Sequence, residues 1–315
     1  MRAKIMLLSA SERDECNLQY AEKILTDISA AFNHTFLLYR ERIGEKSRAA
    51  CGESLTDKAI AACQDCQAVF VCDGRCGGIA ELYDALDLPL SLRSLSVPEC
   101  LCGRNEVPVS LYIGTVLSLD EETLRRAMRA SFLIAHDADM RLCHVTPTGA
   151  SQESWEAAVR VQEAQFPAVS ALKLTAPEAV TELILSPQRM GLLLCPPYAG
   201  SVLLAAGTAL CAHPAVAHDM ALDDEGMGVY AALPRVDGRK SDPLSAALAV
   251  AKLLRFSLRL QRESACLEAA VKNVVSSGWE SGDGSAVSGE GVMKLICEQI
   301  TVAGELMQRG ALGAG

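Results

Sequence analysis

Short apolar runs alternate along the chain with longer segments in which apolar and polar residues mix. Runs such as Ala68–Cys72 and Gly191–Cys195 have the length and composition of buried strands. In the longer segments the apolar residues recur every three or four positions, as on one face of a helix. In the segment Asn17–Ala31 these residues are Leu18, Ala21, Leu25 and Ile28. This alternation predicts an α/β protein whose sheets contain parallel strands and carry helices on their faces.

The same pattern sets the expected bounds of each element. We expect strands over residues 4–8, 35–38, 68–72, 109–113, 141–145, 171–174 and 191–195. We expect helices over residues 17–31, 55–62, 80–86, 121–136, 152–165, 177–184, 201–211, 242–262, 264–276 and 289–308. Thr56 and Asp120 have the residue types that cap the start of a helix. Residues 276–288 are rich in Gly and Ser and indicate a linker.

Composition and charge narrow the classes of partner. The chain has 315 residues, enough for two lobes, and a net charge of −10. An acidic surface argues against nucleic acid and against anionic membranes as partners. The longest stretch without an acidic residue, Lys or Arg, 190–218, is long enough to cross a bilayer. Because Pro196, Pro197 and Gly200 interrupt it, we interpret it as a buried strand followed by a helix.

The 13 cysteines are an odd and high number. The first residues hold only a four-residue apolar run, too short for the core of a signal peptide, so we expect a cytoplasmic protein with reduced thiols. Pairs at short spacing suggest either a zinc or redox site or small apolar filler, and we favour filler because no clustered His accompanies them. These pairs are Cys63 with Cys66, Cys72 with Cys76 and Cys100 with Cys102.

Three segments in the last third of the chain resemble the isopropylmalate/isocitrate dehydrogenase family of β-decarboxylating dehydrogenases. They are DPLSAAL at 242–248, LLRFSL at 253–258 and SGWESGD at 277–283. Weaker similarities follow in the family's order, among them the opening strand at 4–8, Arg93 and Trp155. The resemblance covers nearly the whole chain but is thin before residue 230, and the segment 94–119 is shorter than the dimerisation arm of the family.

The resemblance implies an isopropylmalate/isocitrate dehydrogenase-like fold of two α/β lobes. Residues 1–95 and 212–315 would form the dinucleotide-type lobe, and residues 96–211 the dimerisation lobe. It also implies a homodimer, or a heteromer with an active paralogue, through helices of the middle lobe. The uncharged helix expected over 201–211 is the candidate to face that interface.

The resemblance further implies oxidation and decarboxylation of a 2-hydroxy acid, with NAD or NADP as cofactor and a divalent cation held by three Asp. Here the three Asp positions hold Ser201, Ala205 and Pro177, so we do not expect Mg²⁺ to bind. The family's Lys base would lie near Val145, yet no Lys occurs between Lys58 and Lys173. The family's Tyr acid belongs to the shortened arm. We therefore assign no catalytic residue and no metal ligand.

Weaker candidates remain for the ligand sites. Arg93 matches one of the family's substrate arginines, although a structural role is favoured. The family's dinucleotide loop corresponds to the run containing Tyr230, Pro234, Gly238 and Asp242. Tyr230 has a ring that could stack on an adenine, while Pro234 and Gly238 are more typical of residues that only shape a loop.

Two further clusters favour structural interpretations. His213, His218 and Asp219 have residue types that occur in metal sites, but their spacing is more typical of a solvated turn. Arg125, Arg126 and Arg129 form a basic strip, which we expect to be a solvated helix face paired with Glu121 and Glu122.

Three hypotheses of function follow. The first, which we favour, is a catalytically inactive paralogue with a binding, regulatory or assembly role. The second is an NAD(P)-dependent 2-hydroxy-acid (3-isopropylmalate-like) oxidoreductase with an altered active site. The third is a metal-independent reaction that uses a thiol such as Cys143 or Cys195, but no charged neighbour in the sequence favours a thiolate at Cys195.

Overall fold

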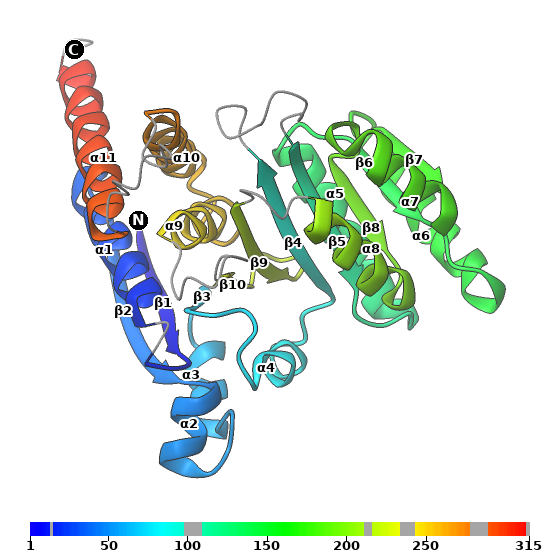
Figure 1. Cartoon of the computed structure of the whole chain (residues 1–315), viewed down its shortest axis with the longest axis horizontal. Helices are drawn as coiled ribbons and strands as arrows, with labels where there is room; N and C mark the ends of the chain where they lie inside the picture. Colours follow the sequence, from blue (N-terminus) through cyan, green and yellow to red (C-terminus); the bar gives the residue numbers. More distant parts are fainter. Residues whose placement is uncertain (13–14, 98–108, 211–215, 234–242, 278–288, 313–315) are drawn as a thin grey trace. The chain divides into compact units, whose positions relative to one another are not determined.

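The computed structural model of the chain describes residues 1–12, 15–97, 109–210, 216–233, 243–277 and 289–312. Contacts divide the chain into two compact units (Figure 1). Unit 1 combines Met1–Leu86 with Gly228–Gly315, and unit 2 is Asp87–Met227. The bounds expected from the sequence, 95/96 and 211/212, place β4 (Leu90–Val97) and β9 (Val216–Leu222) with unit 1. The structure places both strands in unit 2, because they pair with each other and β4 also pairs with β5 (Val109–Val116).

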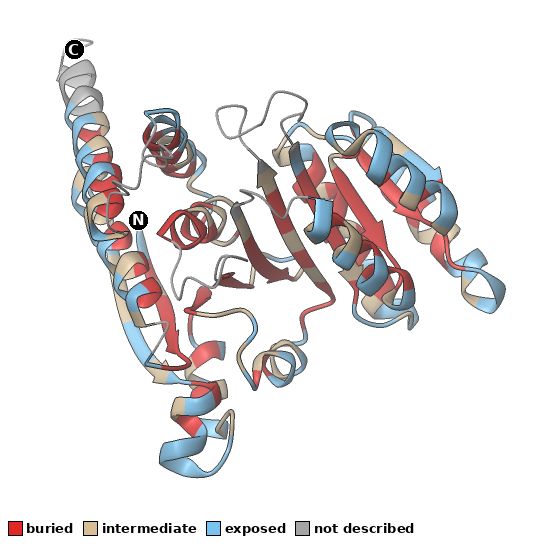
Figure 2. Ribbon diagram, in the orientation of Figure 1, coloured by how far each residue is buried: buried red, intermediate tan, exposed pale blue. Residues whose placement is uncertain are grey.

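The strands of unit 1 are parallel. Their order is β2 (Thr35–Arg42), β1 (Arg2–Ser9), β3 (Ala68–Val71) and β10 (Gly228–Ala232). The inner strands are almost wholly buried, as Figure 2 shows, whereas the outer strand β2 is mostly half-buried or exposed. The helices of this unit are α1 (Glu15–Ala31), α2 (Gly44–Cys51), α3 (Asp57–Gln64), α4 (Ile79–Ala85), α9 (Pro243–Lys252), α10 (Gln261–Ser276) and α11 (Gly289–Leu312). Among them, α1, α9, α10 and α11 pack against one another.

The sheet of unit 2 is mixed. Its strand order is β9, β4, β5, β8 (Leu192–Cys195), β6 (Leu142–Val145) and β7 (Ala171–Leu174). β4 runs antiparallel to both of its neighbours, and the remaining pairs are parallel. The helices are α5 (Glu121–Asp137), α6 (Gln152–Gln165), α7 (Ala176–Leu185) and α8 (Pro197–Leu210). Side chains of β5, β6 and β8 form one apolar cluster with α7 and α8, while α5 packs on α6.

The expected α/β class with a parallel-containing sheet is confirmed. Most expected helices and strands also appear, with ends that differ by a few residues. Both expected helix caps are present: the Thr56 hydroxyl accepts a hydrogen bond from the amide of Ala59, and the Asp120 carboxylate accepts one from the amide of Thr123. None of the described helices has the length and apolarity that crossing a bilayer requires.

The expectation of one helix over 242–262 is wrong. α9 ends at Lys252 and continues as a π-helical turn, Leu253–Ser257. The backbone then breaks at Arg259, whose φ is 57°, before α10 begins at Gln261. The expectations from sequence separated two helices, over 242–262 and 264–276, and the structure places the break between them a few residues earlier. Four elements, α2, β4, β9 and β10, had no counterpart in the expectations from sequence.

Candidate functional site

Helix α8 occupies the position where the resemblance expects two metal-binding carboxylates. It follows the buried strand β8, and Pro197 stands at its first position, where a missing N–H costs nothing. Gly200 and Gly207 bring the helix close to β5: a Cβ at Gly200 would lie 2.2 Å from the Thr115 hydroxyl oxygen. Ser201 and Ala205 are exposed and lie one turn apart on the same face.

The chemistry of α8 does not suit a hard divalent cation. Mg²⁺ requires several oxygen ligands, mostly carboxylates, and this helix offers only hydroxyls and backbone. Within the described ranges, no group of three or more His, Cys, Asp or Glu side chains is placed to hold a metal ion. These residues therefore do not fit the metal that the resemblance implies.

Strand β6 ends where the family's Lys base was expected. The side chain of His144 is buried, and its Nδ1 accepts a hydrogen bond of 3.2 Å from the indole Nε1 of Trp155. Burial lowers the pKa of His144 to about 4, so the ring is neutral at pH 7. Lys173, on the neighbouring strand β7, pairs with Glu156 at 2.6 Å. His144 is therefore engaged by Trp155 and Lys173 by Glu156, and both contacts are structural.

The thiols of the third hypothesis are poor nucleophiles. Burial raises the pKa of Cys143 to about 11, and it also raises the pKa of the fully buried Cys195. Both are therefore protonated at neutral pH, whereas the thiolate is the reactive form. Burial, with a smaller contribution from Cys66, likewise raises the pKa of Cys63 to about 12. The described cysteines are all free, and the burial of this pair supports the filler interpretation.

Arg93 forms a two-pronged ion pair with Asp219. Its Nε lies 2.6 Å from Asp219 Oδ1, and its second amino group lies 2.7 Å from Oδ2. The antiparallel register of β4 and β9 places the two residues opposite each other, and only 21% and 12% of their side chains are exposed. The guanidinium fork is thus engaged by a carboxylate of the same unit. The two residues are 126 positions apart, so nothing in the local sequence indicated the pair.

The interpretation of His218 and Asp219 as part of a solvated turn is wrong. Both lie in strand β9, and they are 1% and 8% exposed. They sit in the strand because β9 pairs along its length with β4, which encloses them in the sheet. His213 lies outside the described residues.

The expectation for the basic strip of α5 is correct for one residue only. Arg125 pairs with Glu122 at 2.6 Å, but Arg126 points to the turn that follows β9, where its Nε lies 3.1 Å from Asp224 Oδ1. Arg125 and Arg129 approach the same carboxylate group at 3.8 and 3.9 Å. Only 9% of the Asp224 side chain is exposed. The strip therefore anchors this turn.

Of the four candidates in the expected dinucleotide loop, Tyr230 is the one that the structure describes. It lies in β10, is fully buried, and its hydroxyl is 2.7 Å from the Ser257 hydroxyl. Ser257 ends the π-helical turn formed by the LLRFSL segment. A ring enclosed in this way presents no face on which an adenine could stack. Pro234, Gly238 and Asp242 lie outside the described residues, so a site for NAD or NADP there stays a prediction.

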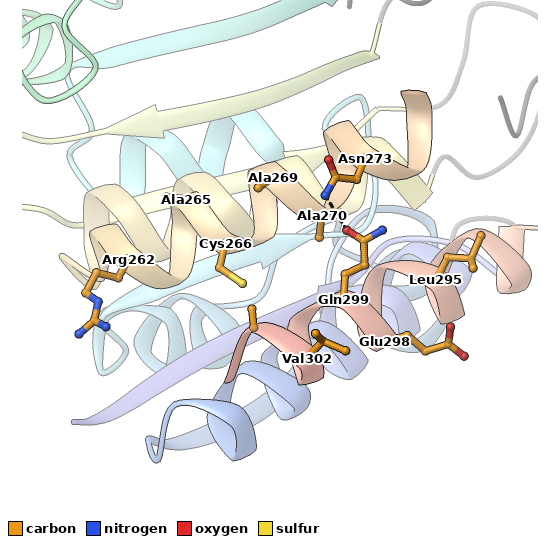
Figure 3. Close-up of a pocket in the computed structure, with 11 residues that line it drawn as sticks. Arg262, Ala265, Cys266, Ala269, Ala270, Asn273, Leu295, Glu298, Gln299 and Val302 are labelled. Atoms are coloured by element: carbon orange, nitrogen blue, oxygen red, sulfur yellow. Dashed lines mark hydrogen bonds between the residues drawn. The ribbon is translucent and has the colours of Figure 1, made fainter. Parts of the chain in front are cut away.

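Described residues of unit 1 line two of its hollows. Figure 3 shows the first, a pocket of about 660 Å³ between α10 and α11, in which mostly apolar side chains surround the thiol of Cys266. The amide of Asn273 donates a 3.0 Å hydrogen bond to Gln299 at its rim. The second, about 580 Å³, lies where β1 and β2 end and is lined by charged side chains. Sequence reasoning missed this second pocket, because its residues come from separate elements between Ser9 and Lys58.

Comparison with known proteins gives a consistent result. No family profile matches the chain. The 3-isopropylmalate dehydrogenase of Oleidesulfovibrio alaskensis is 22% identical over 90% of this chain and 94% of the relative. That of Nitratidesulfovibrio vulgaris is 22% identical over 83% of this chain and 88% of the relative.

Solved structures show the same fold. Isocitrate dehydrogenase from Methylococcus capsulatus aligns with 95% of this chain and 99% of its own, with a TM-score of 0.78 and 14% identity. A β-decarboxylating dehydrogenase from Thermococcus kodakarensis aligns with 95% of this chain and 96% of its own, with a TM-score of 0.71 and 15% identity. Sequence matches along nearly the whole chain agree with this fold, and the low identity agrees with the changed residues of α8. The chain is a divergent member of the isopropylmalate/isocitrate dehydrogenase family.

Proposed function

We propose that the chain is a catalytically inactive member of this family that acts through binding, regulation or assembly. The observation that carries the proposal is the composition of α8, which has no acidic residue from Pro197 to Leu210. In the reaction of the family a cation stabilises the negative charge that develops on the substrate. Without carboxylates to hold it, the cation keeps its water and binds weakly.

Three pairs of polar groups in unit 2 support this proposal. The carboxylate of Asp219 engages Arg93, the indole of Trp155 engages His144, and Glu156 engages Lys173. Each of these contacts satisfies a polar group within the protein. A candidate base or substrate clamp would instead need a polar atom directed at a ligand.

Ligand-dependent thermal stability tests the proposal. Anything that binds only the folded state raises its melting temperature. We expect millimolar Mg²⁺ with isopropylmalate or isocitrate to shift the melting temperature of the wild type by less than about 1 °C. The double variant Ser201→Asp/Ala205→Asp, with both changes at exposed positions, should gain a Mg²⁺-dependent shift. Stabilisation of the wild type by NAD or NADP together with a hydroxy acid would instead support an altered oxidoreductase.

We also propose that α7 and α8 face a second subunit, in a homodimer or in a heteromer with an active paralogue. Five large apolar side chains are exposed on these helices: Ile184, Leu185, Tyr198, Val202 and Leu210. The two helices contact each other, and large apolar side chains exposed on neighbouring helices are typical of an interface. Val202→Asp should raise the dissociation constant of the dimer at least about tenfold, since it buries a charge. Val161→Asp, on α6, is the matched control.

Sedimentation measures the effect. A wild-type protein that sediments as a monomer at micromolar concentration would contradict the homodimer, and a paralogue that then restores a dimer would support the heteromer. We propose a cytoplasmic location as well, supported by the free thiols of the described cysteines.

A further inference from the structure

The charged pocket of unit 1 lies at the edge of the sheet where α/β proteins place their ligands. β1 ends at Ser9 and β2 at Arg42, and because these strands are parallel their carboxyl ends share one edge. Side chains from the ends of both strands and from α1, α2 and α3 line the pocket. Its volume of about 580 Å³ is within the range of sites for small molecules.

Most of the charges in this pocket are balanced by neighbours. Lys46 pairs with Glu15 at 2.6 Å and with the exposed Glu12 at 3.1 Å, and Lys58 pairs with Glu41 at 2.5 Å. Burial opposes ionisation of Glu15, but hydrogen bonds from Lys46 and Ser9 outweigh it and lower its pKa. Glu22 engages a third lining cation, Arg40.

Arg42 differs from these cations. It lines the pocket and is exposed, and its guanidinium makes no hydrogen bond or ion pair to any residue that the structure describes. A guanidinium offers five donors in a planar fork that matches the oxygens of a phosphate or carboxylate. The pocket therefore contains one cation that is available to an anionic ligand.

Ser47 provides a second, independent observation. It lines the pocket and is only 1% exposed, yet its hydroxyl makes no hydrogen bond to another described residue. A serine within a helix commonly satisfies its hydroxyl on the carbonyl one turn earlier, whereas the Ser47 hydroxyl makes no such bond and its oxygen is not fully shielded from solvent. A ligand oxygen in the pocket would supply the missing partner.

We infer that this pocket binds an organic phosphate of about mononucleotide size, whose phosphate group accepts hydrogen bonds from Arg42 and Ser47. The volume exceeds what a phosphate ion alone would fill. The carboxylates of Glu15 and Glu41, which also line the pocket, suit the hydroxyl groups of a sugar and disfavour a second anionic group. The inference does not rest on the proposed function, because no residue of α8 or of the expected dinucleotide loop takes part.

Titration calorimetry with adenosine monophosphate, adenosine and inorganic phosphate tests the inference on the full chain at low salt. Arg42→Gln should weaken binding of the monophosphate about tenfold or more, since it removes a charged hydrogen bond. Ser47→Ala should weaken it about threefold or more, and it keeps the helix intact. Arg48→Gln is the matched control, because Arg48 is exposed on the same helix but does not line the pocket. We expect this control to bind as the wild type does.

Binding of adenosine and of inorganic phosphate shows which part of the ligand the pocket recognises. Adenosine should bind at least about tenfold more weakly than its monophosphate, and inorganic phosphate should compete with the monophosphate. The inference is overturned if the monophosphate does not bind at millimolar concentration, if adenosine binds equally well, or if Arg42→Gln and Ser47→Ala leave the affinity unchanged.

Discussion

Two sets of polar side chains, one in each unit, are arranged in opposite ways. Unit 2 encloses its polar groups: Arg93 faces Asp219, His144 faces Trp155, and α8 carries no charge at all. Unit 1 instead keeps a set of charged side chains open to solvent around the carboxyl ends of β1 and β2, with Arg42 and Lys58 largely exposed. In unit 2 these groups satisfy one another, and elsewhere in that unit the Thr146 hydroxyl and Gln162 Oε1 are buried without a hydrogen-bond partner among the described residues. In unit 1 a ligand can reach the charged side chains.

This difference separates residues that stabilise the fold from residues that can serve a ligand. Substitutions of the enclosed groups of unit 2 should lower stability and leave ligand affinity in unit 1 unchanged. Substitutions at the rim of unit 1 should do the reverse, since exposed ion pairs contribute little to stability. The following predictions test the expectation for unit 2, that its enclosed groups stabilise the fold.

The largest effect is expected for the ion pair between Arg93 and Asp219. Arg93→Gln leaves a largely buried carboxylate without its main partner, and such a loss costs about 3 kcal/mol or more. Chemical unfolding measures the loss. The double variant Arg93→Leu/Asp219→Leu should lose less than the single variant, because it leaves no unpaired charge. If Arg93→Gln keeps wild-type stability but loses stabilisation by a hydroxy acid, Arg93 is a substrate ligand and the comparison fails.

The next effect is a dependence of stability on pH that is caused by His144. Burial first, and then Lys173, lowers the pKa of His144 from 6.5 to about 4, and Glu156 opposes the shift. Between these values the unfolded chain binds a proton that the folded chain excludes, so stability falls as the pH drops through this window. The full loss is about 3 kcal/mol. His144→Gln, an uncharged side chain that can still accept from Trp155, should flatten the wild-type curve, whereas His136→Gln at an exposed position should not. Parallel curves for wild type and His144→Gln would contradict this account.

The smallest effect concerns the packing of α8. A side chain at Gly200 meets Thr115 on β5, so Gly200→Val should lower the free energy of unfolding by about 2 kcal/mol through overpacking. Ser201→Val, one residue further on the exposed side of the helix, should change it by less than about 0.5 kcal/mol. Equal effects of the two variants would show that α8 does not pack on the sheet as described.

The sequence predicted the parallel elements better than the antiparallel ones. The buried strands β3 and β8 consist almost wholly of apolar residues, so their sequence alone identifies them. β9 carries His218 and Asp219, which we interpreted as a turn, because its partner β4 is 126 positions away and gives no local signal. The break before α10 was expected between 262 and 264, but its exact place at Arg259 was not, because a left-handed residue interrupts the backbone without interrupting the apolar pattern.

For the candidate sites, the sequence predicted only which residues of the family's active site are absent. The absence of acidic residues along α8 is a property of the sequence, and the structure adds that Ser201 and Ala205 share an exposed face. The charged pocket was not predictable, because Ser9, Arg42 and Ser47 meet through the pairing of β1 with β2 and through the turn into α2. Neither residue type nor spacing distinguishes Arg42 from Arg48, and only the fold places one in the pocket and the other outside it.

Turnover tests the central claim most directly. The account predicts no NADH or NADPH formation when concentrated protein is incubated with isopropylmalate or isocitrate, Mg²⁺ and either nicotinamide cofactor. Loss of an electrostatic stabiliser of this kind costs about two or more orders of magnitude in rate, and loss of the base adds to it. Robust turnover of the wild-type protein that a chelator abolishes would contradict the account, since it would require a metal site that α8 does not provide.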